Sequence, residues 1–440
     1  GAFDSSRKYS IFIRIMTQGP KELAEALTKH HLVFQHSDAS LEEALSGVKT
    51  FYLGIDPTAD SLHVGHLVPL SLARTLMKSG MKAIILLGGA TGMIGDPSGK
   101  TSERTALSEG EVSPNARALK GQIAETLGTS KFELVNNESW LKRENLLEFL
   151  RDIGKHFTIN EMIRKENVRE RIERPEVSIS YTEFSYALLQ AYDFFHLFER
   201  HEATLQVGGS DQWGNITSGI ELIRKKLGKS AHGITFPLLV DKITGKKFGK
   251  SESGTVWLDG KKTKPFTFYQ FWLSLSDESA LEFLPMLTEI SDEEISRIER
   301  EMKEHPEERS AQRALAQEET SLIHGGKTAT ACERTTEILF GGKISFKELS
   351  REDKRLLLGT ALTIELSRKA FSEGILFVDF LTEKGIMFSK REAREFIQNG
   401  AITLNDEKIT DLGFRLVLKN LPEELSLIRK GKKEVFILSY

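Results

Sequence analysis

The segment between residues 50 and 87 constrains the fold more than any other part of the sequence. Residues 50–55, TFYLGI, form a buried strand pattern that is followed by the turn sequence DPTAD. Residues 63–79 carry apolar side chains at helical spacing, with Gly80 as a stop signal, and residues 83–87, AIILL, form a second short apolar strand. A strand, a crossover helix and a strand of this kind form the βαβ unit of a parallel sheet. The sequence therefore predicts an α/β fold.

Two of the predicted strands are each followed directly by a pair of glycines. Residues 83–87 end in Gly88 and Gly89, and residues 203–207, ATLQV, end in two more glycines before a helical pattern begins. In open α/β sheets, ligands bind in the crevice outside the carboxyl ends of the strands. We therefore expect the glycine-bearing loops to meet at one ligand site.

The length of 440 residues predicts two or three domains. Beyond Pro265 helix-forming residues dominate, whereas the residues after Gly341 return to a mixed pattern with short strands at 401–404 and 434–438. No apolar run approaches the roughly 18 residues of a membrane span. The single cysteine, Cys332, excludes an internal disulfide and a multi-cysteine zinc site.

Residues 1–15 are left out of the fold prediction. They begin without Met, and Arg14 interrupts the apolar core that a secretory signal would need. Two interpretations stay open, a basic organellar presequence and an added leader ahead of a natural start at Met16, and we favour the leader.

The formal charge of -3 conceals an uneven distribution. The chain has 60 Lys and Arg against 63 Asp and Glu, of which residues 341–440 hold 18 and 15. The C-terminal part therefore carries +3 and the rest carries -6. A uniformly basic coat is absent, so any RNA contact must depend on local basic clusters.

Two short motifs suggest a polyphosphate site. His63-Val64-Gly65-His66 stands at the start of the crossover helix, and helix N-termini attract anions. Residues 247–251, KFGKS, belong to a loop rich in Gly and Lys that is able to close over phosphates. Taken alone, the first is more often a solvated or core histidine pair and the second an exposed basic loop. Their co-occurrence favours nucleotide binding.

The glycine-rich stretch 88–101 is not a Walker phosphate loop. Only three residues separate Gly95 from Gly99, where the Walker pattern needs four, and Pro97 removes a backbone donor. A plain tight turn remains an alternative for these glycines.

Two helical patterns carry polar side chains on one face. Tyr186, Gln190 and Asp193 recur at i, i+4 and i+7 within an apolar stretch, which fits either a solvated stripe or hydrogen bonding in a small-molecule pocket. The sequence SKRE at 389–392 is a capping-box pattern that opens a second helix, which ends before Gly400. The cations of this helix, Lys390, Arg391 and Arg394, form either a solvated face or an RNA contact, and we favour the RNA contact.

In combination, these motifs resemble the class I aminoacyl-tRNA synthetases, and in particular the bacterial-type tyrosyl branch. The resemblance covers nearly everything from Met16 onward. Residues 63–66 are similar to the family's HIGH signature and residues 247–251 to its KMSKS signature. The resemblance implies a Rossmann-like parallel-sheet catalytic domain at 16–262, an α-helical anticodon-binding domain at 263–345, and a linker with a small α+β RNA-binding domain of the ribosomal protein S-four type at 346–440.

The resemblance also implies roles for individual residues. The residues implied to bind tyrosine are Tyr52 and Asp193 at the phenol hydroxyl, Asp96, Tyr186 and Gln190 at the ammonium, and Gln206 in the same pocket. The residues implied to act on the phosphates or the reacting carboxylate are Thr58, His63, His66, Lys100, Arg104, Gln212, Lys247, Lys250 and Ser251. Those implied at the nucleotide are Gly54, Asp56, Gly65, Gly209 and Asp211, and those implied at tRNA are Lys390, Arg391 and Arg394.

The activity implied is that of a tyrosine–tRNA ligase, which forms tyrosyl-adenylate and pyrophosphate from tyrosine and ATP and then charges the tRNA for tyrosine. Magnesium enters with ATP, and no protein metal site is expected. The resemblance further implies a homodimer through helices around residues 149–162, no membrane association, and a location in the cytoplasm or, alternatively, an organellar matrix. Two alternatives stay open: a tryptophanyl-tRNA synthetase, and a noncatalytic RNA-binding or splicing protein descended from a synthetase.

Two residues depart from the family pattern. Leu53 stands where bacterial relatives commonly have a Cys near the ribose, so a side-chain hydrogen bond to the sugar is lost. Pro69 lies early in the predicted crossover helix, where a missing N–H is tolerated only in the first turn or at a bend.

Overall fold

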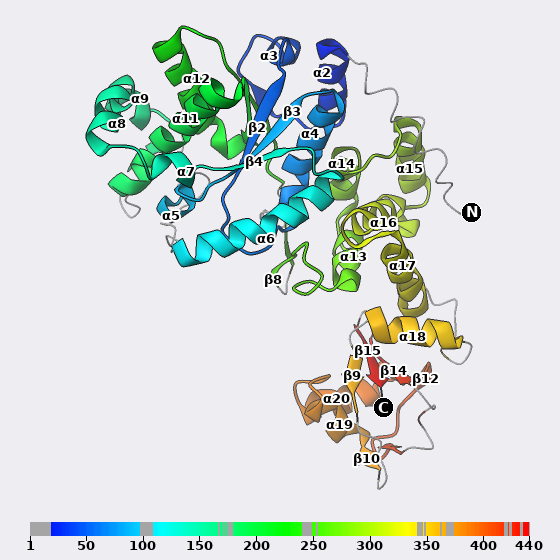
Figure 1. Ribbon diagram of the computed structural model, residues 1–440. Helices are drawn as coiled ribbons and strands as arrows, with labels where there is room; N and C mark the ends of the chain where they lie inside the picture. Colours follow the sequence, from blue (N-terminus) through cyan, green and yellow to red (C-terminus); the bar gives the residue numbers. More distant parts are fainter. Residues whose placement is uncertain are drawn as a thin grey trace. The chain divides into compact units, whose positions relative to one another are not determined.

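The structure is a computed structural model, and the residues that it describes fall into two compact units (Figure 1). The first unit runs to Thr263 and takes in Phe271–Leu315, and the second combines Lys264–Gln270 with the chain from Ala316 onward. The described residues are 19–96, 109–165, 168–169, 172–173, 179–239, 249–251, 254–340, 346, 349–360, 363–366, 374–417, 421, 425–431 and 434–439, of which 109–113, 250–251, 355 and 359–360 are described by their backbone alone.

A mostly parallel sheet forms the centre of the first unit. Within the described residues it has six strands in the order β1-β6-β5-β2-β3-β4, and only the β1–β6 pair is antiparallel. The strands are β1 (Gln35–His36), β2 (Thr50–Ile55), β3 (Lys82–Leu87), β4 (Glu133–Asn136), β5 (Leu205–Gly209) and β6 (His232–Phe236). The predicted α/β fold with a parallel sheet is therefore confirmed.

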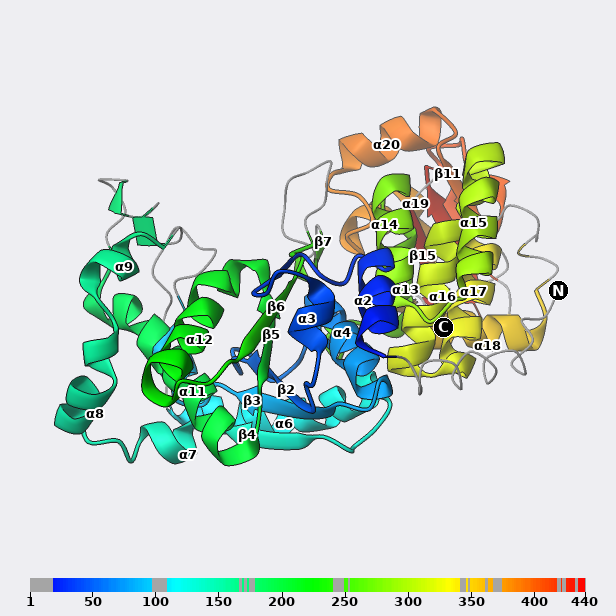
Figure 2. The ribbon, with the colours of Figure 1, turned by 90° about the horizontal axis from the view of Figure 1, so that it is seen from above.

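Helices cover both faces of this sheet (Figure 2). On one face α11 and α12 bury Phe194 and Leu222 in a cluster that also contains Tyr52 of β2, and α4 lies on the opposite face. The helices of this unit are α2 (Pro20–Lys29), α3 (Leu41–Leu45), α4 (Leu67–Lys78), α5 (Thr91–Ile94), α6 (Glu109–Leu127), α7 (Glu138–Leu141), α8 (Leu146–Asp152), α9 (Ile159–Ile163), α11 (Tyr181–His201), α12 (Trp213–Leu227), α14 (Asp277–Leu287) and α15 (Asp292–Glu304). Short 3₁₀ turns lie at Val64–His66, Gly154–His156, Ser210–Gln212 and Pro306–Glu308, and a short hairpin pairs β7 (Lys250–Ser251) with β8 (Gly254–Thr255).

Two predicted elements differ in their bounds. The helix expected over 63–79 begins as the 3₁₀ turn Val64–His66, because side chains at both ends of this turn accept backbone N–H groups, and α4 starts only at Leu67. The strand expected over 203–207 lies at Leu205–Gly209, because Gly208 and Gly209 continue the ladder with β6. Pro69 is the third residue of α4, where its missing N–H would have no intrahelical partner. The first-turn alternative for Pro69 is therefore confirmed.

The second unit contains a smaller α+β assembly. Among the described residues, five strands pair in the order β12-β11-β14-β15-β9, and β10 pairs with β13. The strands are β9 (Thr363–Glu365), β10 (Ile375–Leu376), β11 (Ile402–Leu404), β12 (Glu407–Lys408), β13 (Arg415–Leu416), β14 (Leu425–Lys430) and β15 (Glu434–Ser439). The helices are α17 (Gly326–Phe340), α18 (Arg351–Thr360), α19 (Phe377–Glu383) and α20 (Lys390–Gln398). Phe377 and Phe380 of α19 pack with Ile397 of α20 and Ile402 of β11 in one buried cluster.

Two helices contribute residues to both units, namely α13 (Pro265–Leu273) and α16 (Ser310–His324). The predicted domain boundaries at 262 and 345 stay predictions. In the part of the chain that the structure describes, no helix is long and apolar enough to cross a membrane.

Candidate active site

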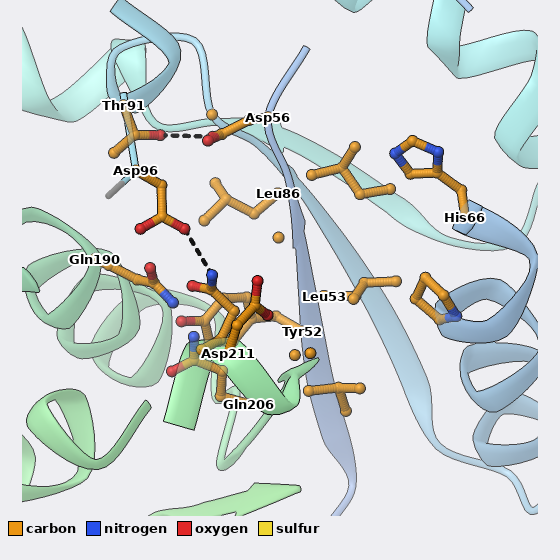
Figure 3. Close-up of a pocket in the computed structure, with 18 of the residues that line it drawn as sticks. Tyr52, Leu53, Asp56, His66, Leu86, Thr91, Asp96, Gln190, Gln206 and Asp211 are labelled. Carbon is orange, nitrogen blue, oxygen red and sulfur yellow. Dashed lines mark hydrogen bonds between the residues drawn. The ribbon is translucent and has the colours of Figure 1, made fainter. Parts of the chain in front are cut away.

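A pocket of about 320 Å³ lies at the carboxyl ends of the central strands (Figure 3). Gly54 of β2, Gly88 after β3, and Gly208 and Gly209 of β5 all line it. The expected meeting of the glycine-bearing loops is therefore confirmed. A cavity of this size is typical of a small-molecule site.

The structure brings most of the predicted site residues together in this pocket. Those that line it are Tyr52, Gly54, Asp56, Thr58, His63, Gly65, His66, Asp96, Tyr186, Gln190, Asp193, Gln206, Gly209, Asp211 and Gln212. Figure 3 shows Asp96, Gln190 and Asp211 on one side of β2 and His66 on the other. Leu53 and Pro69, the two departures from the family pattern, line the pocket as well.

None of the other predicted site residues has a described side chain that lines this pocket. Lys100, Arg104 and Lys247 lie outside the described residues. Lys250 and Ser251 form β7, and only their backbone is described. Lys390, Arg391 and Arg394 all belong to α20, which lies in the other unit and begins at Lys390.

Two buried polar atoms on adjacent strands lack hydrogen-bond partners. Tyr52 of β2 and Gln206 of β5 are directly paired in the ladder, and each is almost fully buried. Within the described residues, the Tyr52 hydroxyl and the Gln206 Oε1 atom make no hydrogen bond. An unsatisfied buried polar group costs folding free energy. These atoms are therefore suited to receive the polar group of a ligand.

Asp193 of α11 is a buried carboxyl group beside Tyr52. Its Oδ2 accepts a hydrogen bond from Asn137 Nδ2 at 2.9 Å, and its Oδ1 accepts one from Trp140 Nε1 at 2.7 Å. Burial raises the pKa of Asp193 to about 7, although these two hydrogen bonds act in the opposite direction. Burial also raises the pKa of Tyr52, and the neighbouring Asp193 charge adds to this rise. At neutral pH the Tyr52 hydroxyl therefore keeps its proton.

The sequence analysis missed Asn137, which connects the Asp193 carboxylate to the loop after β3. Asn137 is fully buried, donates to Thr91 Oγ1 at 3.0 Å, and accepts from the Ala90 N–H at 2.8 Å. Its signal was the short stretch FELV at 132–135, which is followed by two asparagines and largely coincides with β4. The end of β4 thus adds polar side chains to the same edge of the sheet.

Asp56 holds a second buried group in place. Its Oδ2 accepts from the Tyr186 hydroxyl at 3.2 Å, and its Oδ1 accepts from Thr91 Oγ1 at 3.1 Å. A Cβ atom added to Gly88 would stand only 2.0 Å from Asp56 Oδ1. Gly88 is therefore required because the Asp56 carboxylate occupies the space beside it.

A chain of amide and carboxylate groups crosses the pocket from α11 to the loop after α5. Gln212 Nε2 donates to Asp96 Oδ2 at 2.6 Å, while Asn215 Nδ2 donates to Gln190 Oε1 at 3.0 Å and to Gln212 Oε1 at 3.2 Å. Asp96, Gln190 and Gln212 all line the pocket. This wall presents carboxylate and amide oxygens, which bind ammonium groups well.

The two histidines of the 63–66 motif face each other across the 3₁₀ turn, with ring centroids 4.2 Å apart. His63 Nδ1 accepts the Gly65 N–H at 3.0 Å, so the ring proton of neutral His63 lies on Nε2. Burial lowers the pKa of His63, and burial together with His63 lowers the pKa of His66 to about 3. Both rings are therefore neutral at pH 7.

The chain that follows the second signature is hydrogen-bonded to the histidine turn through the backbone. Val64 N–H donates to Val256 O at 3.1 Å, and Leu258 N–H donates to Leu62 O at 2.8 Å. Gly249, with φ near +99°, lies so close to this turn that an added Cβ would be 3.2 Å from Val64 Cγ2. The described end of the KFGKS loop thus packs against the histidine turn.

Metal ligands are not grouped in the described part of the chain. No set of three or more His, Cys, Asp or Glu side chains among those residues is arranged to hold a metal ion. Cys332 is buried, and burial raises its pKa to about 11, so it is not a poised nucleophile.

Comparisons with known proteins agree on one family. The family described as tRNA synthetases class I (W and Y) matches residues 46–341, and the C-terminal domain of tyrosine–tRNA ligases of the SYY type matches residues 365–438. The chain is 44% identical over 423 residues to a tyrosine–tRNA ligase of Streptococcus gordonii and 46% identical over 426 residues to one of Streptococcus mutans, covering 94% of this chain and 99% of each relative.

Among solved structures, the C-terminally truncated mitochondrial tyrosyl-tRNA synthetase of Aspergillus nidulans matches with a TM-score of 0.64 and 30% identity, covering 77% of this chain and all of that one. The relatives that match nearly the whole chain are tyrosine–tRNA ligases, so the comparisons favour tyrosine over the tryptophanyl alternative. The pocket at the strand ends, the paired signatures and these similarities lead to one conclusion: the chain belongs to the tyrosine–tRNA ligases, a branch of the class I aminoacyl-tRNA synthetases.

Proposed function

We propose that the pocket holds L-tyrosine with its phenol hydroxyl between Tyr52 and Asp193. The observation that carries this proposal is the pair of buried polar atoms without partners, the Tyr52 hydroxyl and Gln206 Oε1, next to the buried carboxyl of Asp193. Each oxygen of Asp193 accepts one hydrogen bond from the protein and retains capacity for another. A phenol hydroxyl in this position donates to Asp193, and phenylalanine has no group that can do so.

The opposite end of tyrosine then meets the polar wall of the pocket. The ammonium group binds Asp96, Tyr186 and Gln190, and the carboxylate faces Gln212. This orientation is supported by charge, because Asp96 and its neighbours supply oxygens for a cation. Gly54, Asp56, Gly65, Gly209 and Asp211 surround the nucleotide.

ATP binds at the mouth of the pocket, with Thr58, His63 and His66 at its phosphates. The tyrosine carboxylate is ionised near pH 7 and attacks the α-phosphorus directly, so the reaction needs no protein base. Neutral His63 offers an Nε2–H donor to the oxygens that gain charge, and Lys100, Arg104, Lys247, Lys250 and Ser251 act on the pyrophosphate from loops. Magnesium arrives on the ATP phosphates.

The second step transfers tyrosine to the terminal ribose of the tRNA for tyrosine. Lys390, Arg391 and Arg394 of the α20 region contact its phosphates, and the described part of the 263–345 segment supplies helices for the anticodon end. A cytoplasmic location is part of this proposal.

Exchange of pyrophosphate into ATP tests the pocket assignment directly. Purified protein is expected to exchange label only when L-tyrosine is added, and to charge the tRNA for tyrosine. Tryptophan-dependent exchange would overturn the substrate assignment. Exchange with none of the amino acids would favour the noncatalytic RNA-binding alternative.

The homodimer belongs to the same proposal and is supported by an exposed apolar surface on α8 and α9. Leu146, Leu147 and Leu150 of α8 are all exposed, and so are Ile159 and Ile163 of α9. Both helices lie at the same end of the first unit in two perpendicular views (Figures 1 and 2). Exposed apolar side chains grouped at one end of a unit are typical of a protein interface, and most soluble homo-oligomers are dimers with twofold symmetry.

Leu147→Asp is expected to convert the dimer into monomers. Leu147 is 76% exposed in the single chain, so the change does not affect its core, whereas a charge buried in the interface weakens association by about 100-fold or more. Light scattering during size exclusion measures the mass. Phe34→Asp, at an exposed site on another part of the same unit, serves as the control and stays dimeric. A dimeric Leu147→Asp protein would contradict the α8 and α9 interface.

A further inference from the structure

The residue before the helix cap of α20 has a fixed backbone. Ser389 caps α20 by accepting the Glu392 N–H at 3.1 Å, as the capping-box pattern predicts. The Glu392 carboxylate reaches one residue further than that pattern requires and accepts the Phe388 N–H at 2.7 Å. The main chain of Phe388 is therefore held at the start of the helix, while its side chain is directed away from the core.

The Phe388 side chain lies almost entirely in solvent. It is 96% exposed, although Ile386 and Met387 just before it are buried in the cluster of the second unit. A single exposed apolar residue is common on protein surfaces and is not by itself a site. The groups around Phe388 distinguish it.

One cation lies against this ring, and two more stand on the helix that follows it. Lys430 Nζ lies 5.7 Å from the centre of the Phe388 ring, while it also pairs with Glu392. Arg391 and Arg394 are exposed and, among the described residues, have no acidic partner. Lys390, in contrast, is paired with Asp379 at 2.7 Å. Two free guanidinium groups therefore stand on the helix that follows the exposed ring.

We propose that Phe388 stacks on an unpaired base of the bound tRNA while Arg391 and Arg394 hold the neighbouring phosphates. The inference rests on the proposed function, since it assumes that α20 meets tRNA, and it adds a base contact to the phosphate contacts. Proteins recognise single-stranded parts of RNA by stacking splayed bases on aromatic rings beside basic side chains. Phe388 supplies the aromatic ring and α20 supplies the basic side chains. Because the ring is already exposed and its backbone is hydrogen-bonded, the fold need not rearrange to bind a base.

The surroundings of Phe388 fit RNA better than a protein partner. An apolar docking surface needs several adjacent apolar side chains, and in the described residues 374–417 the structure exposes no other large hydrophobic side chain. Charged residues occupy the first turn of α20 instead. An exposed ring next to Lys430, just before a helix with two arginines that have no described acidic partner, is suited to a nucleotide contact.

Binding of the tRNA for tyrosine to the full-length protein, measured over a range of KCl concentrations, tests the proposal. Phe388→Leu keeps an apolar side chain but removes the ring, and we expect about 5- to 50-fold weaker binding with the slope of log K against log salt unchanged. Phe388→Trp keeps a stacking ring and is expected to bind within about twofold of the parent protein. Arg394→Gln is expected to lower the salt slope by about one unit.

Two further measurements serve as controls. Phe34→Leu changes an exposed phenylalanine of the first unit, outside the segments proposed to contact tRNA, and is expected to bind tRNA normally. Tyrosine-dependent pyrophosphate exchange without tRNA is expected to be the same in the phenylalanine variants as in the parent protein, because Phe388 and Phe34 are absent from the lining of the tyrosine pocket.

The outcomes separate the stacking contact from the proposed function. If Phe388→Leu binds tRNA as tightly as the parent while Arg394→Gln does not, the stacking contact is wrong and tRNA binding by α20 stands. If neither Phe388→Leu nor Arg394→Gln affects tRNA binding, α20 does not contact tRNA. The stacking contact and the proposed phosphate contacts of α20 then both fail. Equal losses for Phe388→Leu and Phe388→Trp, or a changed salt slope in Phe388→Leu, would also overturn stacking.

Discussion

Replacing Asp193 with alanine is expected to lower tyrosine-dependent pyrophosphate exchange about 100-fold at limiting tyrosine. The substitution removes the acceptor for the phenol hydroxyl and leaves the Asn137 and Trp140 donors without partners in a buried site. A hydrogen bond to a charged group contributes about 1.5–3 kcal/mol, and the unpaired donors add to the loss. The effect should appear mainly in the KM for tyrosine, because the proposed orientation puts Asp193 at the phenol end of tyrosine, away from the phosphates.

The raised pKa of Asp193 predicts that tyrosine affinity depends on pH. In the free pocket burial raises this pKa to about 7, and the ionised carboxylate accepts the phenol O–H more strongly than the neutral carboxyl does. As the pH falls below 7, the ionised fraction of Asp193 falls with it, so the Kd is expected to rise by up to about tenfold per pH unit. Calorimetric titration at pH 6 and pH 8 measures this change. Asp193→Asn, which cannot ionise, is expected to bind more weakly and equally at both pH values.

Tyr52→Phe is the matched comparison, because it removes one neutral hydroxyl and no charge. Its loss of tyrosine affinity is expected to be about tenfold, smaller than that of Asp193→Ala, since a neutral hydrogen bond contributes about 0.5–1.5 kcal/mol. Its preference for tyrosine over phenylalanine should also fall. Unchanged tyrosine affinity in Asp193→Ala, or an unchanged preference in Tyr52→Phe, would show that the phenol hydroxyl binds elsewhere.

Much of this pocket followed from the sequence because its residues lie on regular elements. Tyr186, Gln190 and Asp193 share one face of α11 through the helical period, and Gly208 and Gly209 follow the apolar run of β5. The parallel sheet then brings its strand ends to one edge, so residues far apart in sequence meet there. Local periodicity together with one topological rule indicated these positions, and the family resemblance was needed to choose the pocket over a solvated stripe for the residues of α11.

Tertiary contacts decided the rest, and local patterns carried little sign of them. Asn137 follows a strand of only four residues, and nothing near it in sequence indicates that its side chain joins Thr91 to Asp193. The 3₁₀ turn at Val64–His66 depends on hydrogen bonds from the His63 and Gly65 N–H groups to histidine ring nitrogens, which an apolar pattern does not encode. Phe388 was missed for a different reason: a phenylalanine is expected to be buried, and its sequence gives no indication that it is exposed.

Replacing His63 with alanine is expected to lower the kcat of tyrosine activation by about 100-fold or more, with little change in the KM for tyrosine. The ring of His63 accepts the Gly65 N–H through Nδ1, which leaves Nε2–H as a donor at the rim of the pocket. Removal of one donor aimed at a developing negative charge typically costs about 10²–10³ in kcat. Substrate binding is affected less, because the charge on the phosphate oxygens grows only as the transition state forms.

The neutral state of this ring separates a hydrogen-bond role from a role as a positive charge. Burial lowers the pKa of His63 from its usual value near 6.5, so the wild-type rate is expected to show no loss from His63 as the pH rises from 7 to 8.5. His63→Gln keeps an N–H donor at nearly the same reach and is expected to be at least about tenfold faster than His63→Ala. His305→Ala, at an exposed histidine, controls for the loss of an imidazole elsewhere. A glutamine variant as slow as the alanine variant, together with a wild-type rate that falls above pH 6.5, would instead assign His63 the role of a cation.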